Sequence, residues 1–402
     1  MSLFSAFALA SALCADSAAG APPAASCPAD RIEPPPVSIS VDSSRHEVTL
    51  TTGPWTLPDM PPMEDHAMME GAAGSDDAPV QHFEWPVDGW FRGFTYEIVD
   101  AKGNVLDRRL MHHMIMVNFD RRQLLYSAVE RIAGAGSETD DASVPKTIGV
   151  PLSRGMDLGF YIMWHNESGK DLEGVYLKYT MLWTPTNQNP RPITSLPIYM
   201  DVNLTVGGSN TFDVPPGRSE KAYEFTLPVG GRLLGVGGHM HDYGSLVKLV
   251  DAESGKELTR VTAKRDSTGK VLGVSRKLFG VSGEGLKLKA NHRYKVVGVY
   301  DNPTSETRTR GAMAHMVGLF VPDDMSKWPA VDTTDPTMRR DLASLQVPGY
   351  GDALAPSEGE GQGGHGDHPG GHGGRDAAPS SGGDREGHTG ADHSSHDKPP
   401  EQ

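Results

Sequence analysis

Residues 174–185 read GVYLKYTMLWTP. Apolar side chains recur at every second position, at Leu177, Tyr179 and Met181, and a polar residue such as Lys178 lies between each pair. Successive side chains of a β-strand point to opposite faces of a sheet, so this alternation predicts a strand with one buried face. The same alternation recurs along most of the chain.

Most of the remaining chain shows short segments rich in β-branched and aromatic residues, separated by turn signals such as Glu253-Ser254-Gly255-Lys256. Helical periodicity is found only at 123–132 and 337–345. We therefore predict an all-β fold with two jelly-roll-like β-sandwich domains. The further predicted strands are Arg92–Asp100, Asn104–Asp120, Phe160–Asn166, Pro197–Val206, Lys221–Pro228, Gly231–His241, Leu246–Asp251, Arg293–Asp301 and His315–Pro322.

The composition excludes several classes of protein. The 402 residues include 37 Lys and Arg against 52 Asp and Glu, a formal charge of −15 at pH 7. Nucleic acid is therefore not expected as a partner, because phosphate binding needs clustered Lys and Arg. No apolar run reaches the roughly 18 residues of a transmembrane helix, so no transmembrane span is expected. The two cysteines are too few for a Cys-based metal site, whereas 16 His and 17 Met point to a soft metal.

The two ends of the chain are expected to lie outside the folded domains. Residues 3–13 read LFSAFALASAL, which predicts a signal peptide over residues 1–19 and a secreted or periplasmic protein. Residues 351–402 contain six histidines among Gly and Asp and no aromatic residue. We expect this tail to be disordered, because it cannot bury enough apolar surface to offset its ordering entropy. Its histidines form either a metal-binding tract or part of a solubilising tail.

Between the ends, the proline-rich stretch 190–197 is a natural domain boundary. Residues 60–69 read MPPMEDHAMM, a composition typical either of soft-metal capture or of a linker. The expected organisation is an N-terminal segment with this Met-rich loop at 20–79, a first β-sandwich at 80–190 or from about residue 35, a second β-sandwich at 191–325, and a C-terminal extension at 326–350.

Candidate metal ligands lie at four places in or near the predicted strands. His239 and His241 are two residues apart, so both imidazoles point to one face of a strand and can reach one ion. His112 and His113 are direct neighbours, and they reach one metal only if the backbone is bulged or twisted there. The other two places are His165, at the end of a strand, and Met313-Ala314-His315-Met316.

The order of these groups resembles the copper type II, ascorbate-dependent monooxygenases, the family of peptidylglycine α-hydroxylating monooxygenase and dopamine β-monooxygenase. Members carry a His-His-Met motif, a later single His in a strand, a His-x-His-x-x-Gly motif and a ligating Met. The matching positions, within about residues 80–325, are His112-His113-Met114, His165, residues 239–244 (HMHDYG) and Met316.

The resemblance implies two copper ions per chain, one in each sandwich. His112, His113 and His165 would hold the electron-transfer copper. His239, His241 and Met316 would be the catalytic ligands, holding the copper that meets O₂ and substrate, and the soft thioether of Met316 favours Cu(I). The implied activity is hydroxylation of an unactivated C–H bond of a small-molecule substrate with O₂, with ascorbate or a similar reductant as co-substrate.

Some positions depart from the family pattern. Gly237 stands where the peptidylglycine enzyme has a carboxylate-binding Arg, and Phe320 stands where it has a Tyr. A peptidyl-glycine substrate is therefore not expected. His315 stands where an acidic residue is usual before the ligating Met, and it competes with Met316 as a ligand. The chain also has no cysteine after Cys27, so the disulfides of the animal members are absent.

Two other functions fit parts of the sequence. A non-catalytic periplasmic copper-handling protein would use the Met-rich loop at 60–69 and the His-rich tail. A zinc hydrolase with three histidine ligands would use His112 and His113, but no Asp or Glu stands near them as a general base. The hydrolase would also leave Met316 unexplained. Oxygen consumption by the copper-loaded protein would separate an oxygenase from a binding protein.

Overall fold

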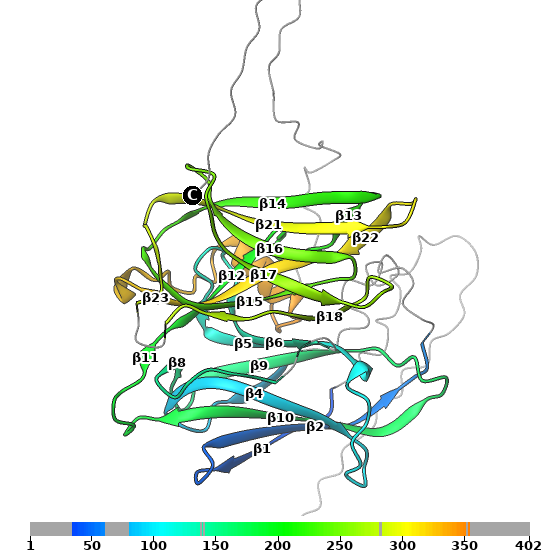
Figure 1. The fold of residues 1–402 in the computed structure, drawn as a ribbon. Helices are drawn as coiled ribbons and strands as arrows, with labels where there is room; N and C mark the ends of the chain where they lie inside the picture. Colours follow the sequence, from blue (N-terminus) through cyan, green and yellow to red (C-terminus); the bar gives the residue numbers. More distant parts are fainter. Residues whose placement is uncertain are drawn as a thin grey trace, which may run out of the picture. The chain divides into compact units, whose positions relative to one another are not determined.

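The computed structural model describes residues 34–60, 80–136, 139, 141–280, 284–350 and 353. Strands dominate these residues, and the one α-helix among them is α1 (Pro336–Ser344), so the all-β prediction is confirmed (Figure 1). No helix within these ranges has the length and apolar character needed to cross a membrane. The expected signal peptide, the Met-rich loop beyond Met60 and nearly all of the His-rich tail lie outside the described residues.

The first sandwich packs two sheets against each other. One sheet has the strand order β1-β2-β10-β4-β8-β11, with β7 beside β4, and the other has the order β3-β9-β5-β6. The first sheet comprises β1 (Val37–Asp42), β2 (Glu47–Leu57), β4 (Gly89–Val99), β7 (Ala142–Ser143), β8 (Ile148–Leu152), β10 (Leu172–Pro185) and β11 (Ile193–Thr194). The second comprises β3 (Gln81–Glu84), β5 (Met111–Arg122), β6 (Val129–Gly136) and β9 (Asp157–Trp164).

Strand β10 forms as its sequence predicts and supplies the centre of the first core. Leu177, Tyr179 and Met181 are all 1% exposed or less. Tyr179 pairs with Leu50 of β2 on one side and Tyr96 of β4 on the other. Burial of each such side chain stabilises the fold by about 1.5–3 kcal/mol, so the alternating pattern fixes which face of the sheet points inward.

The second sandwich has the same two-layer plan. One sheet has the order β12-β23-β15-β19, with β20 beside β15, and the other has the order β14-β21-β16-β17-β18; β13 and β22 form a separate pair. Their bounds are β12 (Leu196–Asp201), β13 (Phe212–Val214), β14 (Gly217–Leu227), β15 (Gly231–Met240), β16 (Gly244–Asp251), β17 (Glu257–Arg265), β18 (Val271–Val274), β19 (Lys277–Leu278), β20 (Leu286–Leu288), β21 (His292–Asn302), β22 (Arg308–Ala312) and β23 (Ala314–Pro322).

All of the described residues belong to one compact unit, in which the four main sheets lie as successive layers (Figure 1). The first sandwich starts near the second of the two expected boundaries, at about residue 35, and it ends beyond residue 190. It includes β1 and β2, which begin at Val37, and it ends after the expected boundary because β11 pairs with β8. The second sandwich therefore starts with β12, at Leu196.

The prediction of a helix over residues 123–132 is wrong. Residues 123–128 form an irregular connection between β5 and β6, and the following residues pair with β5. Leu124 of this connection is 2% exposed and packs in the core of the second sandwich. The hydroxyl oxygen of Tyr126 accepts a hydrogen bond from the backbone N–H of Asp201 at 3.1 Å. These contacts are made with residues far away in the sequence, and they take the place of the expected helix.

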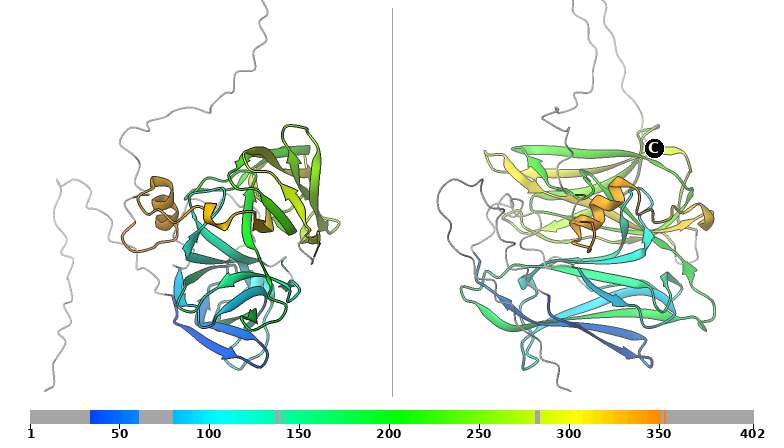
Figure 2. Two further views of the ribbon diagram at one scale, coloured as in Figure 1. Left: turned by 90° about the vertical axis from the view of Figure 1, so that its left-hand side faces the viewer. Right: turned by 180° about the vertical axis from the view of Figure 1, so that it is seen from behind.

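The helix expected at 337–345 is confirmed as α1. Its N-terminus is capped by Asp335, whose carboxylate accepts hydrogen bonds from two backbone N–H groups of the first turn. Met338 and Leu342 pack on the first sandwich, and Arg131 of β6 forms an ion pair with Asp341 at 2.7 Å. Figure 2 shows α1 in orange beside these strands. Two short 3₁₀ turns, η2 (Arg108–Leu110) and η3 (Met325–Lys327), complete the described elements.

Candidate metal centre

His112 and His113 lie at the start of β5, where the strand is bulged. Met111 is opposite Trp164 of β9 and His113 is opposite Met163, so His112 is an extra residue without its own partner position. A bulge of this kind redirects neighbouring side chains that would otherwise point to opposite faces. The two imidazole ring centres lie 4.0 Å apart. The local irregularity on which the sequence-based site depends is therefore present.

His239 and His241 lie at the end of β15 and follow the regular alternation of a strand. Met240, between them, is buried in the second core. The two imidazole ring centres are 5.1 Å apart. Gly238 permits a close approach of β15 to β23, because a β-carbon there would lie 2.7 Å from the carbonyl oxygen of His315.

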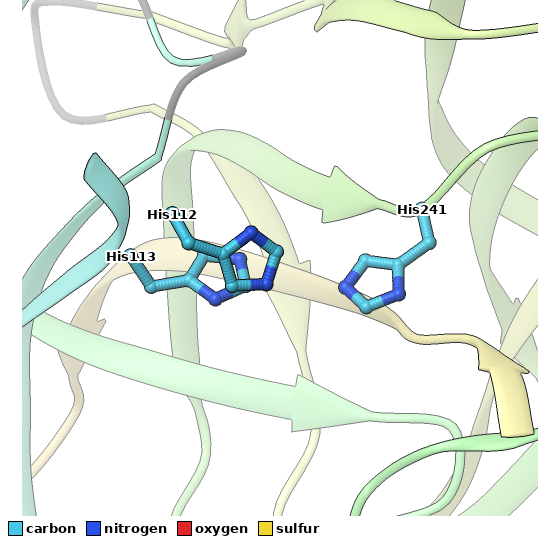
Figure 3. Close-up of side chains that lie close together, drawn as sticks. All are labelled: His112, His113 and His241. Atoms are coloured by element: carbon cyan, nitrogen blue, oxygen red, sulfur yellow. The ribbon is translucent and has the colours of Figure 1, made fainter. Parts of the chain in front are cut away.

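The two histidine pairs converge, although they belong to different sandwiches. One ligand nitrogen from each of His112, His113 and His241 lies within 4.8 Å of the other two (Figure 3). We call these three residues the triad. Nitrogens bound to one ion at about 2.0–2.1 Å lie roughly 3.3 Å apart, so modest side-chain rotations are enough to bring the triad onto a metal. His239 is adjacent, with its ring centre 5.0 Å from that of His113.

A fifth histidine joins the group. His315 of β23 pairs directly with His239 of β15, and their rings are stacked with centres 5.2 Å apart. The hydroxyl of Tyr199 lies 3.2 Å from Nδ1 of His315 and donates a hydrogen bond to Asp201 at 2.6 Å. Burial raises the pKa of Asp201 to about 6, while its hydrogen bonds, first of all the one from Tyr199, act to lower it.

His165 lies outside the triad. It follows β9, its backbone N–H donates to the carbonyl oxygen of Leu110 at 2.9 Å, and its side chain is 9% exposed. Its Nε2 atom is 2.7 Å from a carboxylate oxygen of Glu167. The resemblance groups His165 with His112 and His113, whereas the structure gives it a carboxylate partner and places His241 with those two residues.

Met316 also lies apart from the histidines. It is fully buried in the second core, on the opposite face of β23 from His315. Met313, two residues before His315, is half-buried and lines the cavity described below. Within the segment 313–316, the thioether on the histidine side is therefore that of Met313, which the sequence analysis named with this segment without choosing it as the ligand. The two-residue spacing from His315 is the signal that points to it.

The histidines face a cavity of about 990 Å³ with walls from both sandwiches. His112, His113, His239, His241 and His315 all line it. Imidazole suits zinc, copper, iron and nickel, and a nearby thioether shifts this preference towards copper. The donor set therefore fits a copper ion with direct access to a space large enough for a small substrate.

No family model matches the chain, and no curated protein matches it. Among solved structures, the chain is similar to the major capsid protein P2 of bacteriophage PM2, at 9% identity and a TM-score of 0.29, over 61% of this chain and 93% of that one. A structure of the Sputnik virophage matches at 9% identity and a TM-score of 0.23, over 77% and 91% of the two chains. A putative secreted protein from Eubacterium rectale matches at 10% and 0.19, over 67% and 73%. Similarity this distant carries no argument about the site.

Proposed function

We propose that this chain is a secreted or periplasmic copper-dependent oxidoreductase of the monooxygenase type, which hydroxylates a small-molecule substrate with O₂ and an ascorbate-like reductant. One observation carries the proposal: the ligand nitrogens of His112, His113 and His241 lie within 4.8 Å of one another. These residues come from two separate motifs of the family pattern. Copper bound there would supply one-electron redox chemistry and reactivity towards O₂.

The chain's own groups have distinct tasks in this proposal. The bulge in β5 turns His112 and His113 towards the triad position, and the turn after β15 presents His241 from the other sandwich. Met313, beside them, offers a thioether that favours the cuprous state. The cavity offers room for a small substrate next to the histidines.

The proposed ligand grouping differs from the one that the resemblance implies. In the resemblance, His241 belongs with His239 and Met316, and the copper ions lie in separate sandwiches. The geometry favours a centre that both sandwiches build together, with His241 completing the set of His112 and His113. The predicted roles of His165 and Met316 as copper ligands remain predictions. The experiments proposed in the Discussion test them.

The second candidate is a copper-binding protein without turnover. It is favoured by the same convergence, because a cluster of histidines on one cavity binds copper whether or not a reaction follows. A zinc ion would accept the same three imidazoles, but a zinc hydrolase would leave the thioether that lines the cavity without a role.

Oxygen uptake by the copper-loaded full chain, with ascorbate and with candidate substrates, separates the two functions. A monooxygenase consumes O₂ faster when its substrate is added and forms a hydroxylated product. Copper binding that depends on the triad but gives no such product supports the binding protein. The matched control is the triple variant His112→Ala/His113→Ala/His241→Ala, which retains the His-rich tail and so reports copper chemistry outside the centre. If this variant consumes O₂ as fast as the wild type does, the proposal is wrong.

A further inference from the structure

We propose that His315 is an additional metal ligand and that, together with His239, it forms a second metal position next to the triad. The inference rests on the proposed function, since it takes the triad to be a copper site. It extends that function by assigning the second copper to a pair of residues from adjacent strands of one sheet.

The strand register places both imidazoles on the cavity side. His239 of β15 and His315 of β23 are direct cross-strand partners, with stacked rings inclined by 29°. The neighbours of His315 alternate: Ala314 and Met316 are fully buried in the core, whereas His315 and Val317 line the cavity. A cross-strand pair on one face holds its side chains close enough to share an ion.

The hydrogen bonds of Tyr199 set the tautomer of His315. The single hydroxyl hydrogen of Tyr199 is donated to Asp201 at 2.6 Å, so its oxygen accepts the hydrogen of His315 Nδ1 at 3.2 Å. The proton then lies on Nδ1, and Nε2 carries the lone pair that a metal needs. Metal-ligating histidines are commonly oriented by such a partner on their other nitrogen.

The residues that support His315 through hydrogen bonds are themselves held in place. The carboxylate of Asp201 accepts hydrogen bonds from the backbone N–H of Asn203 at 2.8 Å and from the side-chain amide of Asn210 at 3.2 Å. Asp201 and Tyr199 are both on β12, next to β23, and the two asparagines that bond to Asp201 come from the connection after β12. This is the arrangement expected behind a ligand that must keep one orientation.

The proposed second position is adjacent to the triad. The ring centre of His239 is 5.0 Å from that of His113 and 5.1 Å from that of His241. Met313 stands directly before β23 and lines the same cavity, so its thioether would be the third donor. Two imidazoles with a thioether form a donor set that suits copper.

The test uses the full chain loaded with Cu(II) and dialysed against a weak chelator. We compare His315→Ala, Tyr199→Phe and the control His292→Ala, a histidine of β21 that pairs with Asp251 and Glu253 instead. We expect His315→Ala to lose one copper relative to the wild type and His292→Ala to lose none. Tyr199→Phe keeps the ring but removes the acceptor, so copper affinity at this position should fall by about 10–100-fold.

Electron paramagnetic resonance adds a readout that does not depend on activity. Two neighbouring Cu(II) ions couple, so the wild-type signal should account for less than its copper content, and His315→Ala should restore an isolated Cu(II) signal. Equal copper content in the wild type and in both His315→Ala and Tyr199→Phe would overturn the inference. The proposed function fails separately, if His241→Ala removes no copper or if loaded wild type forms no product. If His315→Ala does not fold, the copper affinity of Tyr199→Phe tests the inference instead.

Discussion

The two histidine pairs of the centre reach the same cavity by different backbone devices. On β15, His239 and His241 use the ordinary two-residue period of a strand, with Met240 buried between them. On β5, His112 and His113 are neighbours, and a bulge brings their rings to within 4.0 Å. The first arrangement can be predicted from the local sequence. The second depends on how β5 pairs with β9, so only the structure reveals it.

The comparison has a consequence for how ligands are grouped. Sequence order suggests that two histidines of one motif hold one ion. In the structure the ligand nitrogens of His241 lie near those of the bulged pair, and His239 is the direct cross-strand partner of His315. On the proposed assignment, the two histidines of this motif would belong to two different metal positions. Four predictions test this division, beginning with the one that has the largest effect.

The first prediction concerns His241. We expect His241→Ala to lose the same copper as His113→Ala, because both residues belong to the triad. The double variant should then lose no more copper than either single variant, a non-additive result typical of groups that act as a unit. Metal analysis of the dialysed protein measures this. Loss of one copper in each single variant and of two in the double variant would restore the grouping implied by the resemblance.

The second prediction concerns the close contact of β15 with β23. A methyl group at Gly238 would lie 2.7 Å from the carbonyl oxygen of His315, so Gly238→Ala should lower the free energy of unfolding by about 1–3 kcal/mol. Gly237→Ala is the matched control, since its methyl group would meet only Arg276, at an ordinary 3.6 Å. Urea unfolding measures both variants. Equal destabilisation by the two would show that the strand contact is not the cause.

The third prediction concerns His165, which the resemblance makes a ligand. Its Nε2 atom lies 2.7 Å from Glu167, and a glutamine amide can replace this contact. We expect His165→Gln to retain the full copper content and to lose about 1–2 kcal/mol of stability. Metal analysis and urea unfolding check the two parts. Release of a copper ion would show that His165 turns to the metal when one is bound.

The fourth and smallest effect is expected at Met316. Leucine has a similar volume, so Met316→Leu should change stability by less than about 1.5 kcal/mol and leave the copper unaltered. Met313→Leu, on the cavity side, should remove sulfur from the copper environment. X-ray absorption of the ascorbate-reduced protein detects that sulfur. Its disappearance in Met316→Leu alone would return the ligand role to Met316.

Much of the fold follows from local pattern. The alternation in β10, β15 and β23 places these strands within two residues of their observed bounds. The same alternation shows that Met313 and Met316 belong to opposite faces, but it does not say which face is buried. That choice is made by the partner strands, which place Met316 in the core. The sequence alone therefore identified a methionine region correctly without identifying its inward face.

The contact between the two sandwiches could not be predicted from local sequence patterns. The connection at 123–128 has apolar residues at a spacing that suggested a helix, yet Leu124 is buried in the core of the other sandwich. Such a contact depends on residues more than seventy positions away, among them Asp201, which bonds to Tyr126. The convergence of His112 with His241 has the same non-local origin.

Leu124 also bears on the energetics of turnover. Withdrawing it from the second core would forfeit about 1.5–3 kcal/mol, and separation of the sandwiches would also break the hydrogen bond from Trp328 to the carbonyl oxygen of Arg122. These contacts join the two sandwiches and so help to fix the spacing of the rings that each contributes. If the chain turns over as proposed, the free energy of bringing the two sandwiches together is spent once, during folding, and would not be needed again in each cycle.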